Sequence, residues 1–139
     1  MEDLYREAII RRYQTPSNRR EIDGANAEGF SQNPLCGDEI RIRARVTDDL
    51  IEDAGFAARG CSISQASADM MADAIRGKTL AEVAELADSF RQLMTEEVET
   101  VPPALEELAV LRSVKKFPVR IKCALLPWDT LRAALDARS

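Results

Sequence analysis

Residues 39–46 read Glu-Ile-Arg-Ile-Arg-Ala-Arg-Val, so apolar and charged residues alternate through this stretch. A period of two is typical of a β-strand with one buried face and one solvated face. The next three residues, Thr47-Asp48-Asp49, predict a turn. We therefore expect a second strand over about residues 50–58, antiparallel to the first. A third strand from the preceding loop can extend this hairpin.

The apolar period changes to 3.6 from residue 62, which predicts an amphipathic helix that Gly77 terminates. Ser62 and Gln65 have the spacing of a capping box at its start. Thr79 and Glu82 form a second capping box, which predicts another helix that runs to about residue 94.

The remaining segments complete the expected order. They are a helix over residues 2–13, a loop over 14–34, a loop over 95–103, a helix over about 104–116, a short helical segment that starts at Pro118 and is interrupted by Pro127, and a last helix capped by Asp129. This order predicts a single α+β domain over residues 1–139, with a small antiparallel three-stranded sheet and helices packed on one face.

Composition excludes several classes of function. The 139 residues are 45% hydrophobic and carry a formal net charge of −5, which argues against non-specific binding to nucleic acid. The apolar runs are too short to span a bilayer, and the charged start of the chain does not resemble a signal peptide. We therefore expect a cytoplasmic protein with no membrane partner. It is expected to be a monomer when free, because no surplus apolar face is evident.

The three cysteines are the residues that point to chemistry. Cys36, Cys61 and Cys123 are each expected at a boundary between elements, and the chain has no histidine. An odd number of cysteines disfavours a disulfide framework. The lack of histidine excludes Ser-His-Asp and Cys-His catalytic pairs. It also means that a metal site here must use thiolates and carboxylates.

The surroundings of the cysteines favour thiolates. Cys61 is expected at the N-terminus of a helix, and Arg120 precedes Cys123 by three residues. Asp38 follows Cys36 by two residues and can supply a carboxylate to the same site. Three thiolates and one carboxylate suit tetrahedral zinc, and sulfur-rich ligation also suits iron–sulfur clusters. The alternative is that the cysteines are small buried apolar residues, because no CxxC pair is present.

Three motifs in this chain resemble those of the U-type iron–sulfur assembly family, which includes IscU and SufU. They are Asn-Pro-Leu-Cys-Gly-Asp at 33–38, Gly-Cys-Ser-Ile-Ser-Gln-Ala-Ser at 60–67 with Met-Met at 70–71, and Arg-Ile-Lys-Cys at 120–123 with Leu126 and Trp128. The resemblance extends from the N-terminal to the C-terminal helix.

The resemblance implies the SufU branch of this family. The IscU branch has a histidine immediately before its third cysteine, where this chain has Lys122. The SufU branch carries an extra segment between its second and third cysteines, and residues 88–114 look like that segment. By this resemblance Cys36, Asp38, Cys61 and Cys123 are zinc ligands.

The resemblance also implies a role as a sulfurtransferase that accepts sulfur from a cysteine desulfurase of the SufS type. Cys36 is the implied acceptor, freed when a histidine of the partner replaces it on zinc, and the sulfur then passes to downstream Suf scaffold proteins. One alternative is a scaffold that assembles a [2Fe–2S] cluster on the three cysteines. Another is a non-catalytic module with structural zinc that only regulates the desulfurase. Arg120 and Arg59 are further candidates for orienting the site or the partner.

Overall fold

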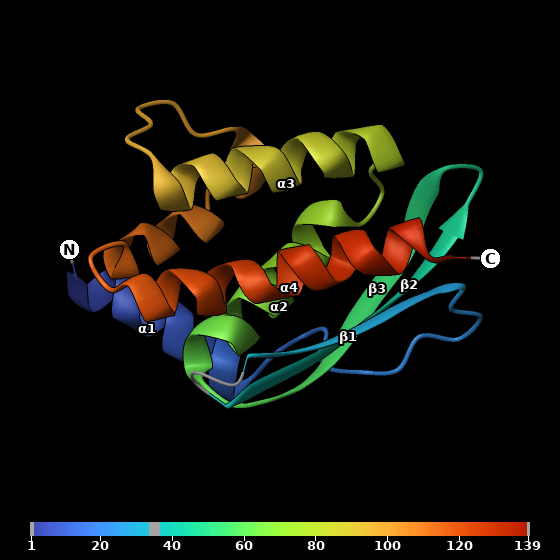
Figure 1. Cartoon of the computed structure of the whole chain (residues 1–139), viewed down its shortest axis with the longest axis horizontal. Helices are drawn as coiled ribbons and strands as arrows, with labels where there is room; N and C mark the ends of the chain where they lie inside the picture. The colour runs from blue at the N-terminus through green and yellow to red at the C-terminus, as the bar shows by residue number, and fades with distance from the viewer. Residues whose placement is uncertain (1, 34–36, 139) are drawn as a thin grey trace.

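The computed structural model describes the backbone of residues 2–33 and 37–138, and the side chains of residues 6–33 and 37–138. Its elements are α1 (Glu2–Gln14), β1 (Ala27–Asn33), β2 (Asp38–Thr47), β3 (Leu50–Arg59), α2 (Ser62–Ile75), α3 (Leu80–Thr95), the 3₁₀ helices η1 (Pro103–Leu105) and η2 (Leu108–Val114), and α4 (Pro118–Asp136). The sheet order is β1-β2-β3. Helices cover one face of the sheet (Figure 1), so the predicted α+β fold is confirmed.

The predicted hairpin is present with the expected turn. β2 pairs antiparallel with β3, and the turn residues Asp48 and Asp49 have φ of 52° and 60°. Side chains along β2 alternate between buried and half-buried positions. On the outer face Arg41 and Arg43 both pair with Glu28 of β1. The alternation therefore placed the apolar residues toward the helices and the arginines toward solvent.

The third strand expected from within the loop over residues 14–34 is β1, which pairs antiparallel with β2, so the three-stranded sheet is confirmed. β1 is polar, and it lacks the apolar alternation that identified β2. Its central Gly29 lies against α4, where a Cβ would come within 2.7 Å of the Thr130 carbonyl oxygen. β1 is thus held by its ladder to β2 and by close contact with α4 rather than by its own propensity.

α2 lies at the centre of the domain. Most of its side chains are buried, including Met70 and Met71 in the core as expected. The predicted capping box of Ser62 and Gln65 is wrong, because the helix begins one residue earlier with Cys61 at the N-cap position. The Gln65 side-chain amide instead donates to the Gly60 carbonyl oxygen, at 3.2 Å.

The expected break at Pro127 does not occur, because α4 is one continuous helix. Pro127 removes one helical N–H, and nearby hydroxyl groups supply other donors to this part of the helix. Thr130 donates to the Leu126 carbonyl oxygen, and Ser67 of α2 donates to that of Ala124, both at 2.7 Å. Asp129 pairs with Arg91 rather than capping a new helix.

The segment expected as one helix over 104–116 forms the two 3₁₀ helices η1 and η2. The buried residues Leu105, Leu108 and Leu111 recur every third residue. A 3₁₀ helix has three residues per turn, so within η2 this spacing places Leu108 and Leu111 on one face. The predicted extra segment at 88–114 covers the end of α3, the loop and both 3₁₀ helices, and its origin as an insertion stays a prediction.

α3 begins where expected. Thr79 and Glu82 form a complete capping box, with each side chain accepting from the backbone of the other. Phe90 of α3 stacks on Trp128 of α4 with ring centroids 5.3 Å apart, which joins the two helices. None of the helices in the described part of the chain combines the length and the apolar character that crossing a membrane requires.

Asp53 of β3 gives the fold a dependence on pH. Its carboxylate accepts hydrogen bonds from Arg20 at 2.7 Å and Arg76 at 3.1 Å. The Arg20 hydrogen bond is the largest of the causes that lower the pKa of Asp53 to about 2. A carboxyl whose pKa is depressed by folding stabilises the native state above its unfolded pKa, and this contribution is lost as pH falls toward the folded pKa.

We therefore expect Asp53→Asn to lower the free energy of unfolding by about 1–2 kcal/mol at pH 7. The difference from wild type should shrink as pH falls from about 4 toward 2. Urea unfolding over a series of pH values measures it. Asp23→Asn, at an exposed position, is the control and should show no such trend. An Asp53→Asn deficit that stays constant down to pH 3 would contradict this account.

Candidate metal centre

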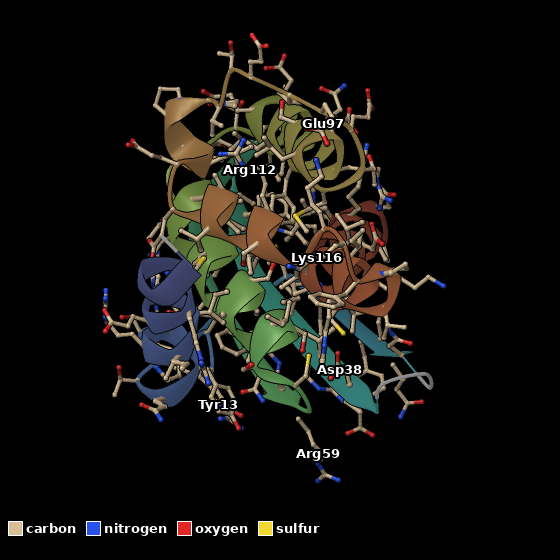
Figure 2. The ribbon with its side chains drawn as sticks, turned by 90° about the vertical axis from the view of Figure 1, so that its left-hand side faces the viewer. Tyr13, Asp38, Arg59, Glu97, Arg112 and Lys116 are labelled. Carbon is tan, nitrogen blue, oxygen red and sulfur yellow. The ribbon has the colours of Figure 1, made fainter. Side chains whose placement is uncertain are left out.

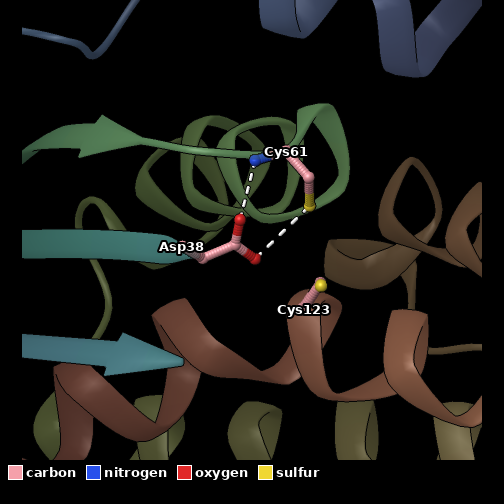
Figure 3. Close-up of side chains that lie close together, drawn as sticks. All are labelled: Asp38, Cys61 and Cys123. Carbon is pink, nitrogen blue, oxygen red and sulfur yellow. Dashed lines mark hydrogen bonds between the residues drawn. The ribbon is translucent and has the colours of Figure 1, made fainter. Parts of the chain in front are cut away.

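Three of the four predicted ligands meet at one end of the sheet. Asp38 is the first residue of β2, Cys61 immediately precedes α2, and Cys123 lies in α4. Figure 3 shows the three side chains converging from these elements. One ligand atom from each lies within 4.8 Å of the other two. Cys36, the fourth predicted ligand, lies outside the described residues.

Cys123 differs from its expected location. It was predicted at a boundary between elements, and it lies instead within α4, fully buried. It lies in the second turn of α4, which carries its sulfur to the other two groups.

Asp38 is fully buried and organises the start of α2. One carboxylate oxygen, Oδ1, accepts the backbone N–H of Cys61 at 2.7 Å. The other, Oδ2, accepts the Cys61 thiol at 3.3 Å. A single carboxylate thus holds both the backbone and the side chain of Cys61.

Gly60 makes this arrangement possible. Its φ is +124°, which favours glycine, and a Cβ at this position would lie 2.3 Å from Asp38 Oδ1. The same Cβ would lie 2.8 Å from the Asp38 Cα. A side chain at residue 60 would therefore displace the carboxylate that holds Cys61.

The surroundings of Cys61 favour its thiolate. A hydrogen bond from Cys123 is the largest influence on its pKa, and the backbone N–H of Ser64 in α2 acts in the same direction. Burial and the charge of Asp38 oppose them, and the net effect lowers the pKa of Cys61 to about 6. The hydrogen bond from Cys123 thus makes the thiolate form of Cys61 more accessible than that of an ordinary cysteine.

Arg120 lies beside both sulfur atoms. It precedes Cys123 by three residues on α4, so the two side chains project from the same face of the helix. The negative charge of Cys61, followed by that of Cys123, raises the pKa of Arg120. Arg120 thus supplies positive charge next to the thiolates. Arg59, by contrast, projects from the end of β3 (Figure 2), with its side chain 83% exposed and 3.9 Å from Glu39.

The donor set fits a metal that accepts both sulfur and oxygen. Zinc bonds of about 2.0–2.3 Å in a tetrahedron place ligand atoms roughly 3.3–3.8 Å apart. The oxygen and sulfur atoms here already lie within 4.8 Å of one another, so small side-chain movements suffice. Asp38, Cys61 and Cys123 therefore form a candidate metal site.

Two residues that matter to this site were missed as functional positions. Gly60 was noted only as part of a motif, although a glycine directly before a cysteine at a strand-to-helix junction signals close backbone approach. Ser67 ties α2 to α4 one residue after Cys123, through its hydrogen bond to Ala124. No local pattern distinguishes Ser67 from the other small residues of α2.

The fold and this site define a family. Residues 4–124 match the family described as NifU-like N terminal domain, and the chain belongs to that family. The solved structure of FiSufU, a protein of the SUF system from thermophilic Fervidobacterium islandicum AW-1, superposes with a TM-score of 0.82. The two chains are 33% identical, and the match covers 93% of this chain and 94% of FiSufU.

Two curated relatives are similar over most of their length. The zinc-dependent sulfurtransferase SufU of Bacillus subtilis is 37% identical over 131 residues, which cover 94% of this chain and 88% of the relative. The iron–sulfur cluster assembly scaffold protein IscU of Streptococcus pyogenes serotype M1 is 38% identical over 132 residues, covering 95% and 82%.

Proposed function

We propose that this protein is a zinc-dependent sulfurtransferase that accepts persulfide sulfur from a SufS-type cysteine desulfurase for iron–sulfur cluster assembly. The observation that carries the proposal is the convergence of Asp38, Cys61 and Cys123 in a chain without histidine. The similarity to a SufU named as zinc-dependent supports the choice of metal. Cys36, two residues before Asp38 in the sequence, is the proposed fourth ligand and the sulfur acceptor.

The proposed transfer is an exchange between a thiolate and a persulfide. The Cys36 sulfur bonds to the outer sulfur of the donor's persulfide, the donor's S–S bond breaks, and the donor cysteine leaves as a thiolate. The transferred sulfur keeps its oxidation state, so no oxidant or reductant is needed. The product is a persulfide on Cys36, which passes its outer sulfur to a downstream Suf scaffold protein by the same exchange.

The chain's own residues prepare this site. Asp38 holds Cys61 through two hydrogen bonds, and Arg120 places positive charge beside the sulfur atoms. Asp38 and Cys123 are fully buried, which shields both side chains from solvent. When bound, zinc would keep its thiolate ligands deprotonated and restrain their reactivity.

The decisive test combines metal analysis with desulfurase turnover. Purified protein should contain one zinc per chain. It should stimulate a SufS-type desulfurase and acquire one sulfur atom on Cys36, detected by mass spectrometry of the peptide. Cys36→Ser should reduce stimulation to the level of the desulfurase alone, because the acceptor is lost. Cys61→Ser is the matched variant, and it should lose zinc because it removes a ligand from the described cluster.

A scaffold for a [2Fe–2S] cluster is the second candidate, since two converging thiolates suit iron as well as zinc and one close relative is named as a scaffold. Iron with acid-labile sulfide in the purified protein would favour it. Stimulation that survives in Cys36→Ser would contradict sulfur transfer through Cys36 and favour a purely regulatory module.

A further inference from the structure

Residues 112–122 concentrate positive charge beside the candidate metal centre. This stretch, Arg-Ser-Val-Lys-Lys-Phe-Pro-Val-Arg-Ile-Lys, has five basic residues and no acidic one in a chain whose net charge is −5. It joins the end of η2 to the first turn and a half of α4 and stops immediately before Cys123. We call it the basic strip.

Several basic residues of the strip differ from the arginines on the outer face of the sheet in how they are paired. On the outer face of the sheet, Arg41 and Arg43 form ion pairs with glutamates of the same chain. Within residues 6–33 and 37–138, by contrast, neither Lys116, Arg120 nor Lys122 forms an ion pair with a carboxylate. Lys115 of the strip pairs with Glu97 at 3.7 Å, and Arg120 lies beside the sulfur atoms of Cys61 and Cys123. Within the described residues, the charge of the strip that no carboxylate matches is therefore that of Arg112, Lys116 and Lys122.

The strip also exposes apolar side chains. Phe117 is 51% exposed and Val119 is 44% exposed, although burial of either apolar side chain would be favourable. The Lys116 ammonium lies 5.6 Å from the centre of the Phe117 ring, so charge and apolar surface are adjacent. Exposed aromatic side chains surrounded by charge are typical of partner-binding surfaces.

A hollow lies at the end of the strip distant from Cys123. It has a volume of about 540 Å³ between the loop after α3 and the end of η2. Its lining residues are Glu97, Val98, Arg112, Ser113, Lys115 and Lys116. Figure 2 shows Lys116 between Arg112 and Asp38 in one view. Cys123 follows Pro118 by five residues, a rise of only about 7.5 Å along α4, so the strip reaches the metal centre.

We propose that the basic strip and its hollow bind an acidic segment of the sulfur-donor protein, with Phe117 and Val119 as apolar anchors. This inference rests on the proposed function, because sulfur transfer requires a donor protein to approach the candidate metal centre, where Cys36 is the proposed sulfur acceptor. The occupant follows from charge: unmatched lysine and arginine side chains favour Asp and Glu on the partner. The contact would orient the donor so that its persulfide reaches the metal centre.

The test measures binding of a purified SufS-type desulfurase by calorimetry, at low and at high salt, for wild type and single variants. Lys116→Glu should raise the dissociation constant about fivefold at low salt and weaken its dependence on salt. Lys78→Glu makes the same change in charge after the C-terminal end of α2, whereas Cys61 precedes the N-terminal end of that helix. This control should leave the dissociation constant unchanged. Both variants should retain the zinc content of wild type.

The apolar anchor has its own pair of variants. Phe117→Ala should weaken binding about tenfold, whereas Leu50→Ala, exposed at the β2–β3 turn, should not. If Lys116→Glu and Phe117→Ala bind as tightly as their controls while wild type binds, the strip is not the docking surface and the proposed function stands. If wild type itself does not bind the desulfurase, both proposals fail.

Discussion

Arg12→Ala is expected to lower the free energy of unfolding by about 3 kcal/mol or more. Arg12 of α1 donates to Asp69 and Asp73 of α2, each at 2.7 Å, and to Glu107 beside η2 at 2.5 and 2.8 Å. Asp69 is fully buried. Removing Arg12 leaves this carboxylate in the interior without its counter-charge, which costs more than the loss of an exposed ion pair.

Urea unfolding of the metal-free protein measures this effect. Arg11→Ala removes the neighbouring, exposed arginine of the same helix and should cost less than about 0.5 kcal/mol. Asp69→Asn combined with Arg12→Met removes both charges and keeps an oxygen for the Asn18 N–H, which donates to Asp69 at 2.8 Å. This double variant should recover part of the loss. If Arg12→Ala and Arg11→Ala lower the free energy of unfolding equally, the pairing of Arg12 with the buried Asp69 does not stabilise the fold.

The same variant tests how α1 is held. Arg12 links α1 by ion pairs both to Asp69 of α2 and to Glu107 beside η2. We expect hydrogen exchange in α1 to accelerate more than exchange in the central strand β2 when Arg12 is replaced. Uniform acceleration would instead indicate that the network stabilises the whole domain as one unit.

Gly60→Ala is expected to damage stability and metal binding together. The added Cβ would lie 2.3 Å from Asp38 Oδ1, so the carboxylate must move and its hydrogen bond to the Cys61 N–H must break. The left-handed backbone at φ +124° adds conformational strain. From both effects together we expect the free energy of unfolding of the metal-free protein to fall by about 2–3 kcal/mol. The zinc affinity should become at least tenfold weaker.

Gly77→Ala is the matched control, because Gly77 has φ +83° and a Cβ there would meet nothing within 4 Å. Gly77→Ala should lower the free energy of unfolding by about 1 kcal/mol, from backbone strain alone, and leave zinc affinity unchanged. Urea unfolding and competition with a chromophoric zinc chelator provide the two measurements. If Gly60→Ala and Gly77→Ala have the same stability and the same zinc affinity, the position of Asp38 does not depend on a glycine at residue 60.

Local patterns in the sequence predicted most elements for reasons confined to neighbouring residues. The alternation at 39–46 identified β2, and the pair Thr79 and Glu82 identified the start of α3. Both signals depend on side chains within one strand or one helical turn. The errors occurred where local rules competed with packing: residues 104–116 form two 3₁₀ helices in place of one α-helix, and Pro127 lies inside α4.

The candidate site shows the same division. The absence of histidine and the positions of Cys36, Asp38, Cys61 and Cys123 in the three motifs were sufficient to name a sulfur-rich set of ligands, and the structure brings Asp38, Cys61 and Cys123 together. Their chemical environment was not predictable in the same way. The pKa of Cys61 depends first on Cys123, which is 62 residues away in the chain.

The sequence by itself determined the class of fold, the position of the central hairpin and the residue types available to a metal, because these depend on periodicity and composition. Only the tertiary structure decided that α4 continues through Pro127 and carries Cys123 to Cys61, that Gly60 leaves room for Asp38, and that Arg12 pairs with a buried aspartate. Each of these depends on contacts between segments far apart in the chain, whose free energy no local pattern records.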